Sequence, residues 1–224
     1  MTASAERWCQ HGGVETSSPP RSRYHHGDLR NAITTASLAA ARAGGPDAVV
    51  LRDIARRLGV SHNAGSRHFA RRGDLMAAVA DVGLAELANA IETSLAEVTP
   101  GSDPQHRARA RLRAVGRAYV HYAQAEAGLF RTIWAASRDP AARPGPAARG
   151  PSGLGPYQLL SAAFDDLVEA GALPEHRRPY SELAAWSAVH GLATLVIDGP
   201  LSRVPADDID AALTRLCDII DAGL

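Results

Sequence analysis

The stretch from Val50 to Phe69, VLRDIARRLGVSHNAGSRHF, constrains the fold of this chain more than any other. Its first half has apolar residues at the spacing that puts one stripe along a short helix. Gly59 then supplies a residue that can take the left-handed conformation in which helices often end, and Ser61 is a good N-cap for a second helix. Two short helices joined by a tight turn containing glycine are typical of a helix-turn-helix, so this stretch predicts a unit that reads DNA.

The distribution of charge supports this interpretation, although the formal net charge of the whole chain is zero. Residues 20–75 contain ten Arg and four Asp, which is a net charge of +6. Residues 76–224 contain thirteen Arg and eighteen acidic residues, which is a net charge of −5. A basic head on an acidic body is expected when only one part of a protein meets phosphate.

The rest of the chain has the periodicity of helices and no alternating strand pattern, so we predict an all-α fold. The segment Tyr180–Ile197 is apolar on nearly all sides and should therefore be buried on more than one side. The composition predicts a disordered tail at 1–23, a helix-turn-helix domain at 24–73 and a helical body at 74–224, with a flexible loop rich in Pro and Gly at about 138–156. Further helices are expected to start at or just after Asp28, Asp74, His106, Glu126, Tyr157, Tyr180 and Asp207.

Several other classes of protein are not supported by the sequence. There is no apolar run of the ~18 residues that a membrane span needs, and no signal-peptide pattern, so we expect a cytoplasmic protein. Cys9 and Cys217 are far apart, and the adjacent His25 and His26 have no further ligands at metal-binding spacing, so we predict no metal and no cofactor. No nucleophile–base arrangement or phosphate-binding glycine loop is present, so we predict no catalytic residues.

The residues from about Tyr24 to Val79 resemble the TetR family of one-component transcriptional regulators. The resemblance is carried by YHHGDLR, LRDIARRLGVS and RHFARRGDL in this order and spacing. Further along, LFRTIWA and the WSAVHG segment starting at Trp186 are similar to a C-terminal subgroup named for its Trp-His-Gly motif. The resemblance implies a three-helix DNA-binding head, a helical ligand-binding body and a homodimer formed mainly by the last two helices, at about 180–197 and 207–222.

The same resemblance implies which side chains meet double-stranded DNA. Arg52, His62 and Asn63 match positions that reach bases, and Arg and Asn are suited to guanine and adenine respectively. Arg67 lies further along the recognition helix. Ser61, His68 and Arg72 match positions that anchor phosphate, although His68 is equally well explained as a helix end packed on its neighbours.

Two positions depart from the family pattern. Ser66 stands where the family usually has a Tyr that grips phosphate; Ser can still form that hydrogen bond but reaches less far. Gly65 replaces a residue that is usually apolar or Pro, and a Gly inside a helix costs roughly 0.5–1 kcal/mol relative to Ala. We therefore expect a less rigid recognition helix in the free protein.

A ligand pocket between the body helices is predicted from aromatic side chains that share their inner faces, although such residues are more often plain core. The candidates are Tyr119, Tyr122, Phe130, Trp134, Phe164, Trp186 and His190, with Tyr157 as a further aromatic neighbour. The interpretation is a homodimeric regulator that represses from a palindromic operator and is released by an unknown small-molecule effector. The alternative is a DNA-binding regulator without a ligand response, acting as a constitutive or architectural factor.

Overall fold

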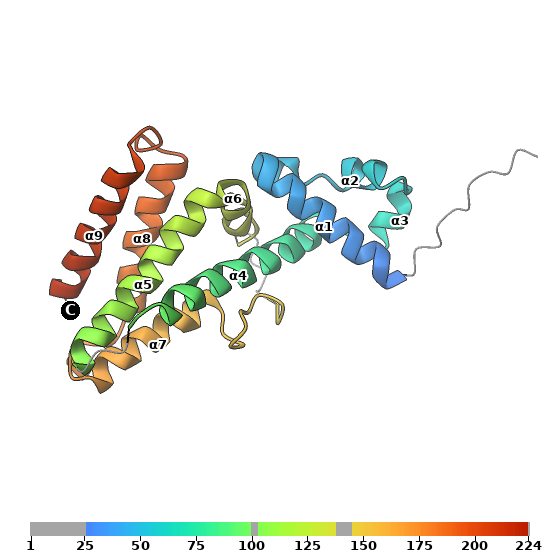
Figure 1. Cartoon of the computed structure of the whole chain (residues 1–224). Helices are drawn as coiled ribbons and strands as arrows, with labels where there is room; N and C mark the ends of the chain where they lie inside the picture. The colour runs from blue at the N-terminus through green and yellow to red at the C-terminus, as the bar shows by residue number, and fades with distance from the viewer. Residues whose placement is uncertain (1–25, 100–102, 138–144, 224) are drawn as a thin grey trace, which may run out of the picture.

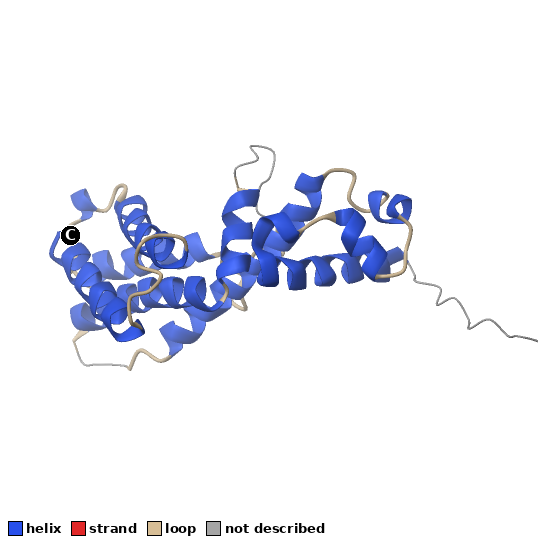
Figure 2. Cartoon of the chain, turned by 90° about the horizontal axis from the view of Figure 1, so that it is seen from above, coloured by secondary structure: helices blue, strands red, loops and turns tan. Residues whose placement is uncertain are grey.

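The computed structural model describes residues 26–99, 103–137 and 145–223, and these contain helices, turns and loops but no strand (Figure 2). The prediction of an all-α fold is confirmed. The predicted tail at 1–23 and the first part of the predicted loop, 138–144, lie outside the described residues. Figure 1 shows two parts, with α1 to α3 at one end, α5 and α7 to α9 toward the other, and the long helix α4 running between them; α6 lies in the middle, next to α1.

The head packs its first three helices against the start of α4. Its core includes Ile33, Ile54, Phe69 and Leu75, which are almost fully buried. The apolar stripes predicted for this region therefore face one another. Its elements are α1 (His26–Gly44), the 3-10 turn η1 (Gly45–Ala48), α2 (Leu51–Arg57), α3 (His62–Ser66) and the first turns of α4 (Arg72–Ala96).

The turn between α2 and α3 forms as the sequence predicts. Gly59 has a φ of +69°, in the left-handed region that glycine adopts without strain. Ser61 is extended, and its hydroxyl accepts a hydrogen bond from the backbone N–H of Ala64 at 3.2 Å. This bond satisfies one of the N–H groups that a helix start leaves free. The predicted helix-turn-helix is confirmed.

The starts of α1 and α4 differ from the prediction. α1 begins at His26, two residues before the predicted start at Asp28. α4 begins at Arg72, two residues before the predicted start at Asp74, and Arg71 is its N-cap. The Asp74 carboxylate accepts hydrogen bonds from the Arg71 guanidinium at 3.1 Å and from its backbone N–H at 3.0 Å. These bonds lower the pKa of the Asp74 carboxyl, and they stabilise the helix start from its first turn.

The body is a bundle in which α5 is central and α4, α6, α7, α8 and α9 surround it (Figure 1). Its core includes Leu87, Phe130, Phe164 and Leu213. The predicted helices are present with ends shifted by a few residues. They are α5 (Pro104–Ala125), α6 (Ala127–Ala136), α7 (Pro156–Glu169), the 3-10 turn η2 (Glu175–Arg177), α8 (Ser181–Ile197) and α9 (Ala206–Gly223).

The described part of the loop before α7 is held against α4. Asp81 accepts a hydrogen bond from the backbone N–H of Gly145 at 2.9 Å, and Glu92 accepts one from the Ser152 hydroxyl at 2.8 Å. The flexibility predicted for 138–156 stays a prediction. None of the described helices is long and apolar enough to cross a membrane.

Two helices belong to both cores. α4 contributes Leu75 to the head core and Leu87 to the body core, and α6 contributes Leu129 to the head and Phe130 to the body. At Gly128, a Cβ atom would lie less than 3.0 Å from the carbonyl oxygens at the end of α1, so the two backbones touch where only glycine fits. The head and the body are therefore packed together through α4 and α6.

Candidate nucleic-acid interface and ligand pocket

The residues predicted to meet bases lie on the outside of the head. Arg52 is the second residue of α2, and His62 and Asn63 open α3; all three are exposed. Arg67 is also exposed, but it follows α3 directly because that helix ends at Ser66. The starts of α2 and α3 thus present polar side chains to solvent, as a surface that reads base edges must.

Several residues predicted to anchor phosphate are already oriented by bonds within the head. The Ser61 hydroxyl caps α3. The Ser66 hydroxyl donates to the carbonyl of His62 at 3.1 Å and lies 3.3 Å from Nε2 of the same residue. The Arg72 guanidinium donates to the carbonyl of Pro46 in η1 at 2.6 Å. Guanidinium groups have further donors, so this bond leaves Arg72 able to meet phosphate. The predicted contacts with DNA stay predictions.

His68 lies where the segment after α3 returns to α1. It is half-buried, and its carbonyl accepts a hydrogen bond from the Arg30 guanidinium at 2.8 Å. The same guanidinium lies 4.4 Å above the ring centroid of Phe69. Arg30 therefore fixes the end of the helix-turn-helix on α1, and the phosphate contact predicted for His68 stays a prediction.

Gly65 has a packing reason for departing from the family pattern. It is buried, and a Cβ atom there would lie 3.2 Å from Cδ1 of Leu51 and 3.7 Å from Cδ1 of Ile33. Glycine lets α3 approach α2 and α1 closely. A sequence pattern along one short helix cannot reveal this contact, because the partners come from two other helices. The lower rigidity expected of the recognition helix stays a prediction.

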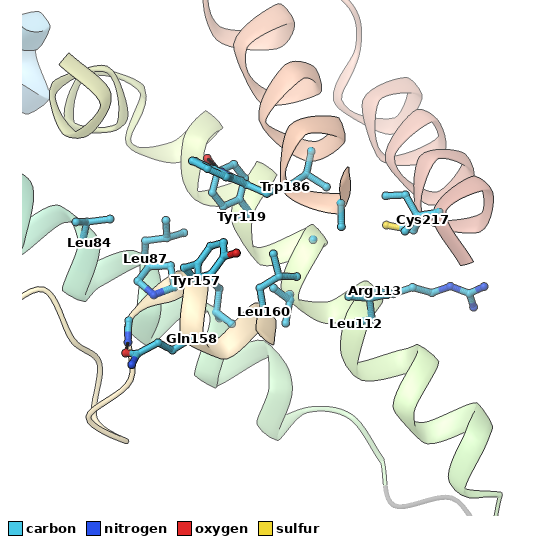
Figure 3. A pocket seen from close by; sticks show the side chains of 18 of the residues that line it. Leu84, Leu87, Leu112, Arg113, Tyr119, Tyr157, Gln158, Leu160, Trp186 and Cys217 are labelled. Atoms are coloured by element: carbon cyan, nitrogen blue, oxygen red, sulfur yellow. Dashed lines mark hydrogen bonds between the residues drawn. The ribbon is translucent and has the colours of Figure 1, made fainter. Parts of the chain in front are cut away.

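A cavity of about 330 Å³ lies in the body, between α4, α5, α7 and α8, and reaches α9 (Figure 3). This volume is within the roughly 300–1,000 Å³ of small-molecule sites. Most of its walls are apolar, with Leu84 and Leu87 from α4, Leu112 from α5 and Leu160 from α7. Cys217 of α9 also lines it, and burial raises the pKa of its thiol.

Three of the seven residues predicted for a pocket line this cavity: Tyr119, Trp134 and Trp186. Tyr157 lines it too, and Figure 3 shows Tyr119, Trp186 and Tyr157 close together, between Leu84 on one side and Cys217 on the other. His190 lies behind them, where Nδ1 and the Tyr119 hydroxyl are 2.8 Å apart. Burial lowers the pKa of His190, which favours the neutral ring that accepts this hydrogen bond. The indole N–H of Trp186 donates to the same tyrosine oxygen at 3.2 Å.

The other three predicted pocket residues are core side chains and do not line the cavity. Phe130 and Phe164 are almost completely buried in the body core. Tyr122 is buried as well, and its hydroxyl donates to the carbonyl of Gly83 at 3.1 Å. These three aromatic side chains are part of the core, which is the more common position for aromatic residues at helical spacing. The aliphatic lining residues were not predicted, since Leu at helical spacing has the same pattern in a core and in a cavity wall.

Ion pairs close the α9 end of the cavity. The Arg109 and Arg113 guanidinium groups each lie 2.9 Å from the carboxylate of Asp221, and Arg113 is also 3.0 Å from Asp218. Within the described residues, no group of three or more His, Cys, Asp or Glu is placed to hold a metal ion.

A second ion-pair cluster, which the sequence did not reveal, joins the head to the body. Arg42 at the end of α1 donates to Glu86 of α4 at 2.7 Å and to Glu126, between α5 and α6, at 3.0 Å. The Tyr122 hydroxyl lies 3.4 Å from the same Glu86 carboxylate. One side chain of the head thus contacts two elements of the body.

The comparison with known protein families finds one match in the body. Residues 112–220 match the family model described as a tetracyclin repressor-like C-terminal domain. This match does not test the resemblance to the Trp-His-Gly subgroup, which stays a prediction. A search of curated proteins finds no match.

Solved structures match over almost the whole chain. A protein with unknown function from Rhodococcus sp. RHA1 is 30% identical, with a TM-score of 0.71, covering 91% of this chain and 99% of that one. The TetR family transcriptional regulator PfmR from Thermus thermophilus is 20% identical, with a TM-score of 0.51, and 86% and 98% of the two chains are covered.

A putative TetR family regulator from Shewanella sp. PV-4 is 18% identical, with a TM-score of 0.56 and coverage of 85% and 96%. The two named regulators share the fold, and the family model covers the body behind a helix-turn-helix head. Regulators of this family act by binding DNA and are not enzymes. The chain belongs to the TetR family of transcriptional regulators.

Proposed function

We propose that this protein is a homodimeric repressor that binds a palindromic operator through its heads and leaves it when a small molecule occupies the cavity. One observation carries the proposal: two of the helices that line the cavity, α4 and α6, also contribute to the head core. Leu84 and Leu87 of α4 line the cavity, and Leu75 of the same helix packs in the head. A molecule that shifts α4 in the body must therefore displace part of the head core.

Helix α6 gives a second mechanical connection. Trp134 and Ser137, at its end, line the cavity, while Gly128 and Leu129, at its start, touch α1 and the head core. The ion pairs of Arg42 hold the same junction. Ligand binding that favours another position of α6 then changes the orientation of the head, which is a population shift between two states of the dimer.

The dimer is supported by apolar side chains that the single chain leaves exposed on its last two helices. Leu183 and Leu195 of α8 are 53% and 45% exposed, and Ile219 of α9 is 55% exposed. Pairing these faces around a twofold axis would form a four-helix bundle and bury them. Two heads related by this axis require an operator of two inverted half-sites.

The operator is identified by selecting bound sequences from a random DNA pool with the full-length protein. Arg52→Ala should relax the preference at one base position in each half-site, since an Arg that pairs with guanine contributes about 1–3 kcal/mol of discrimination. Arg72→Ala should weaken binding to all sequences alike and reduce its dependence on salt. Arg203→Ala removes an exposed Arg from the loop between α8 and α9 and is the control for charge. An Arg52→Ala protein with unchanged sequence preference would refute the base contact.

Ligand response separates the repressor from the alternative, a regulator that stays bound to DNA constitutively. A thermal-shift screen with a panel of metabolites detects any ligand that binds the native state, because free ligand at about 100 times its Kd stabilises by about 2.7 kcal/mol. Fluorescence anisotropy of the selected operator then measures release. A ligand that stabilises the protein but leaves the operator bound supports the alternative.

A further inference from the structure

The charges at the cavity are balanced within the protein itself. The charged side chains in the described lining are Arg109, Arg113 and Asp221, and they form ion pairs with one another. Asp218 completes the set as a second partner of Arg113, so two cations face two anions. Figure 3 shows the Arg113 side chain extending away from Tyr119 and Trp186 rather than toward them.

The polar groups of the lining are also largely engaged. The Tyr119 hydroxyl is shared between His190 and Trp186. The Gln158 side-chain oxygen accepts the backbone N–H of Gly155 at 3.0 Å, and the Ser137 hydroxyl donates to a backbone carbonyl within α6 at 3.0 Å. Two buried N–H groups of lining residues have no hydrogen-bond partner. One is the uncharged indole N–H of Trp134, and the other is Nε–H of Arg113, whose guanidinium is already paired with Asp218 and Asp221.

A charged ligand would find no net opposite charge in this lining, because the charged groups already neutralise one another. A carboxylate placed near Arg109 and Arg113 would lie beside the carboxylate of Asp221, which already neutralises them, and an ammonium group placed near Asp221 would lie beside both guanidinium groups. Moving an ion from water into an apolar cavity is unfavourable unless it gains a partner there. An uncharged molecule meets neither obstacle and gains from burying apolar surface.

We propose that the cavity selects an uncharged, mainly apolar small molecule and discriminates against anions and cations of the same shape. The inference names the ligand class of the site and rests on the proposed function for its regulatory meaning. It predicts a specific role for Asp221, which is to neutralise two arginines that would otherwise attract an anion.

The test uses a pair of fluorescent probes that differ in charge. N-phenyl-1-naphthylamine is neutral, and its sulfonated analogue, anilinonaphthalene sulfonate, is an anion. The neutral probe should bind the full-length protein at least about tenfold more tightly than the anion, a difference that corresponds to about 1.4 kcal/mol. In Asp221→Asn this preference should shrink at least about threefold, because Arg109 loses its carboxylate partner. Non-specific binding of the probes to apolar surface would not change with this substitution.

Two further variants locate the site. Leu84→Trp fills the cavity from α4 and should weaken binding of the neutral probe, whereas Asn89→Trp adds the same ring at an exposed position of the same helix and should not. Competition with 1-octanol, octanoate and octylamine extends the comparison to cations, and the alcohol should displace the probe at the lowest concentration. Melting curves confirm that each variant is folded.

The outcomes separate the ligand class from the regulatory role. Four results would each overturn the inference. The first two are equal affinity for both probes and an unchanged preference in Asp221→Asn. The others are equal binding by Leu84→Trp and Asn89→Trp, and no binding of the neutral probe. Operator release is measured separately by anisotropy. Selective binding of neutral molecules without any release would leave the ligand class standing and contradict the proposed repressor mechanism.

Discussion

The head and the body differ in where their polar side chains form hydrogen bonds. In the head, Arg52, His62 and Asn63 are exposed on short helices and directed at solvent, where a partner can meet them. In the body, Tyr119 is bonded to two other side chains inside the protein and lines a largely apolar cavity. The head therefore offers hydrogen bonds to its partner, while the body offers shape and apolar contact. The two surfaces should respond differently to salt, charge and packing.

The largest effect should come from breaking the head core alone. Phe69 is almost fully buried there, and Phe→Ala in a core typically costs about 3–5 kcal/mol. We expect Phe69→Ala to abolish operator binding in a gel shift, while the body still binds the neutral fluorescent probe.

The matched control is Phe164→Ala, which removes the same ring from the body core. It should weaken probe binding and lower the melting temperature of the body. If Phe69→Ala destroyed probe binding as completely as Phe164→Ala does, the head and the body would be one cooperative unit, and the contrast between them would be wrong.

The next effect should come from the place where the backbones of the two parts touch. In Gly128→Ala the new methyl group would press on the carbonyl oxygens of Ala41 and Arg42, which cannot move independently of α1. Overpacking of this kind costs about 1–3 kcal/mol. Urea unfolding should show this loss, and operator affinity should fall with it.

Gly83→Ala tests whether the backbone contact is the cause. That methyl group would also be too close to a neighbour, but the neighbour is the flexible end of the Ile133 side chain in the same α4–α6 interface. We expect a smaller loss, because the side chain can move and Ala favours the helix by about 1 kcal/mol. Equal losses in the two variants would contradict the account of Gly128.

A smaller change in stability should follow the loss of the Arg42 ion pairs. Arg42 and its partners are partly exposed, and such pairs contribute about 0–1 kcal/mol. Arg42→Gln should therefore melt close to the wild type, yet it should change the amount of ligand needed to release the operator, because the pairs join the head to the body. A variant with unchanged stability and unchanged release would show that the cluster does not couple the two parts.

The contrast also explains what could be predicted from sequence. The head was recognisable because its determinants are close together along the chain: Gly59 forms the turn and Ser61 caps the helix that follows it. The cavity was not, because its walls come from six helices and only their packing distinguishes Leu84 from a core leucine. The same reason accounts for Gly65 and Gly128, whose close neighbours lie on other helices. Non-local packing is the information that residue spacing lacks.

The smallest effect should be a pH dependence in the body that the head does not share. The His190 imidazole lies among rings, with centroids 5.0 Å from Trp134 and 5.8 Å from Phe130, and burial lowers its pKa. The unfolded chain then binds a proton more readily than the folded one. The contribution of the neutral His190 ring to the free energy of unfolding is therefore complete above the ordinary pKa of about 6.5 and is lost as the pH falls below it. A protonated ring could also no longer accept the hydrogen bond from Tyr119.

Between about pH 7.5 and 5.5, the melting temperature of the wild type should fall more than that of His190→Gln. His106→Gln, which removes an exposed imidazole from the same body, should behave as the wild type does. Equal pH dependence in all three proteins would show that the aromatic surroundings of His190 do not hold it neutral.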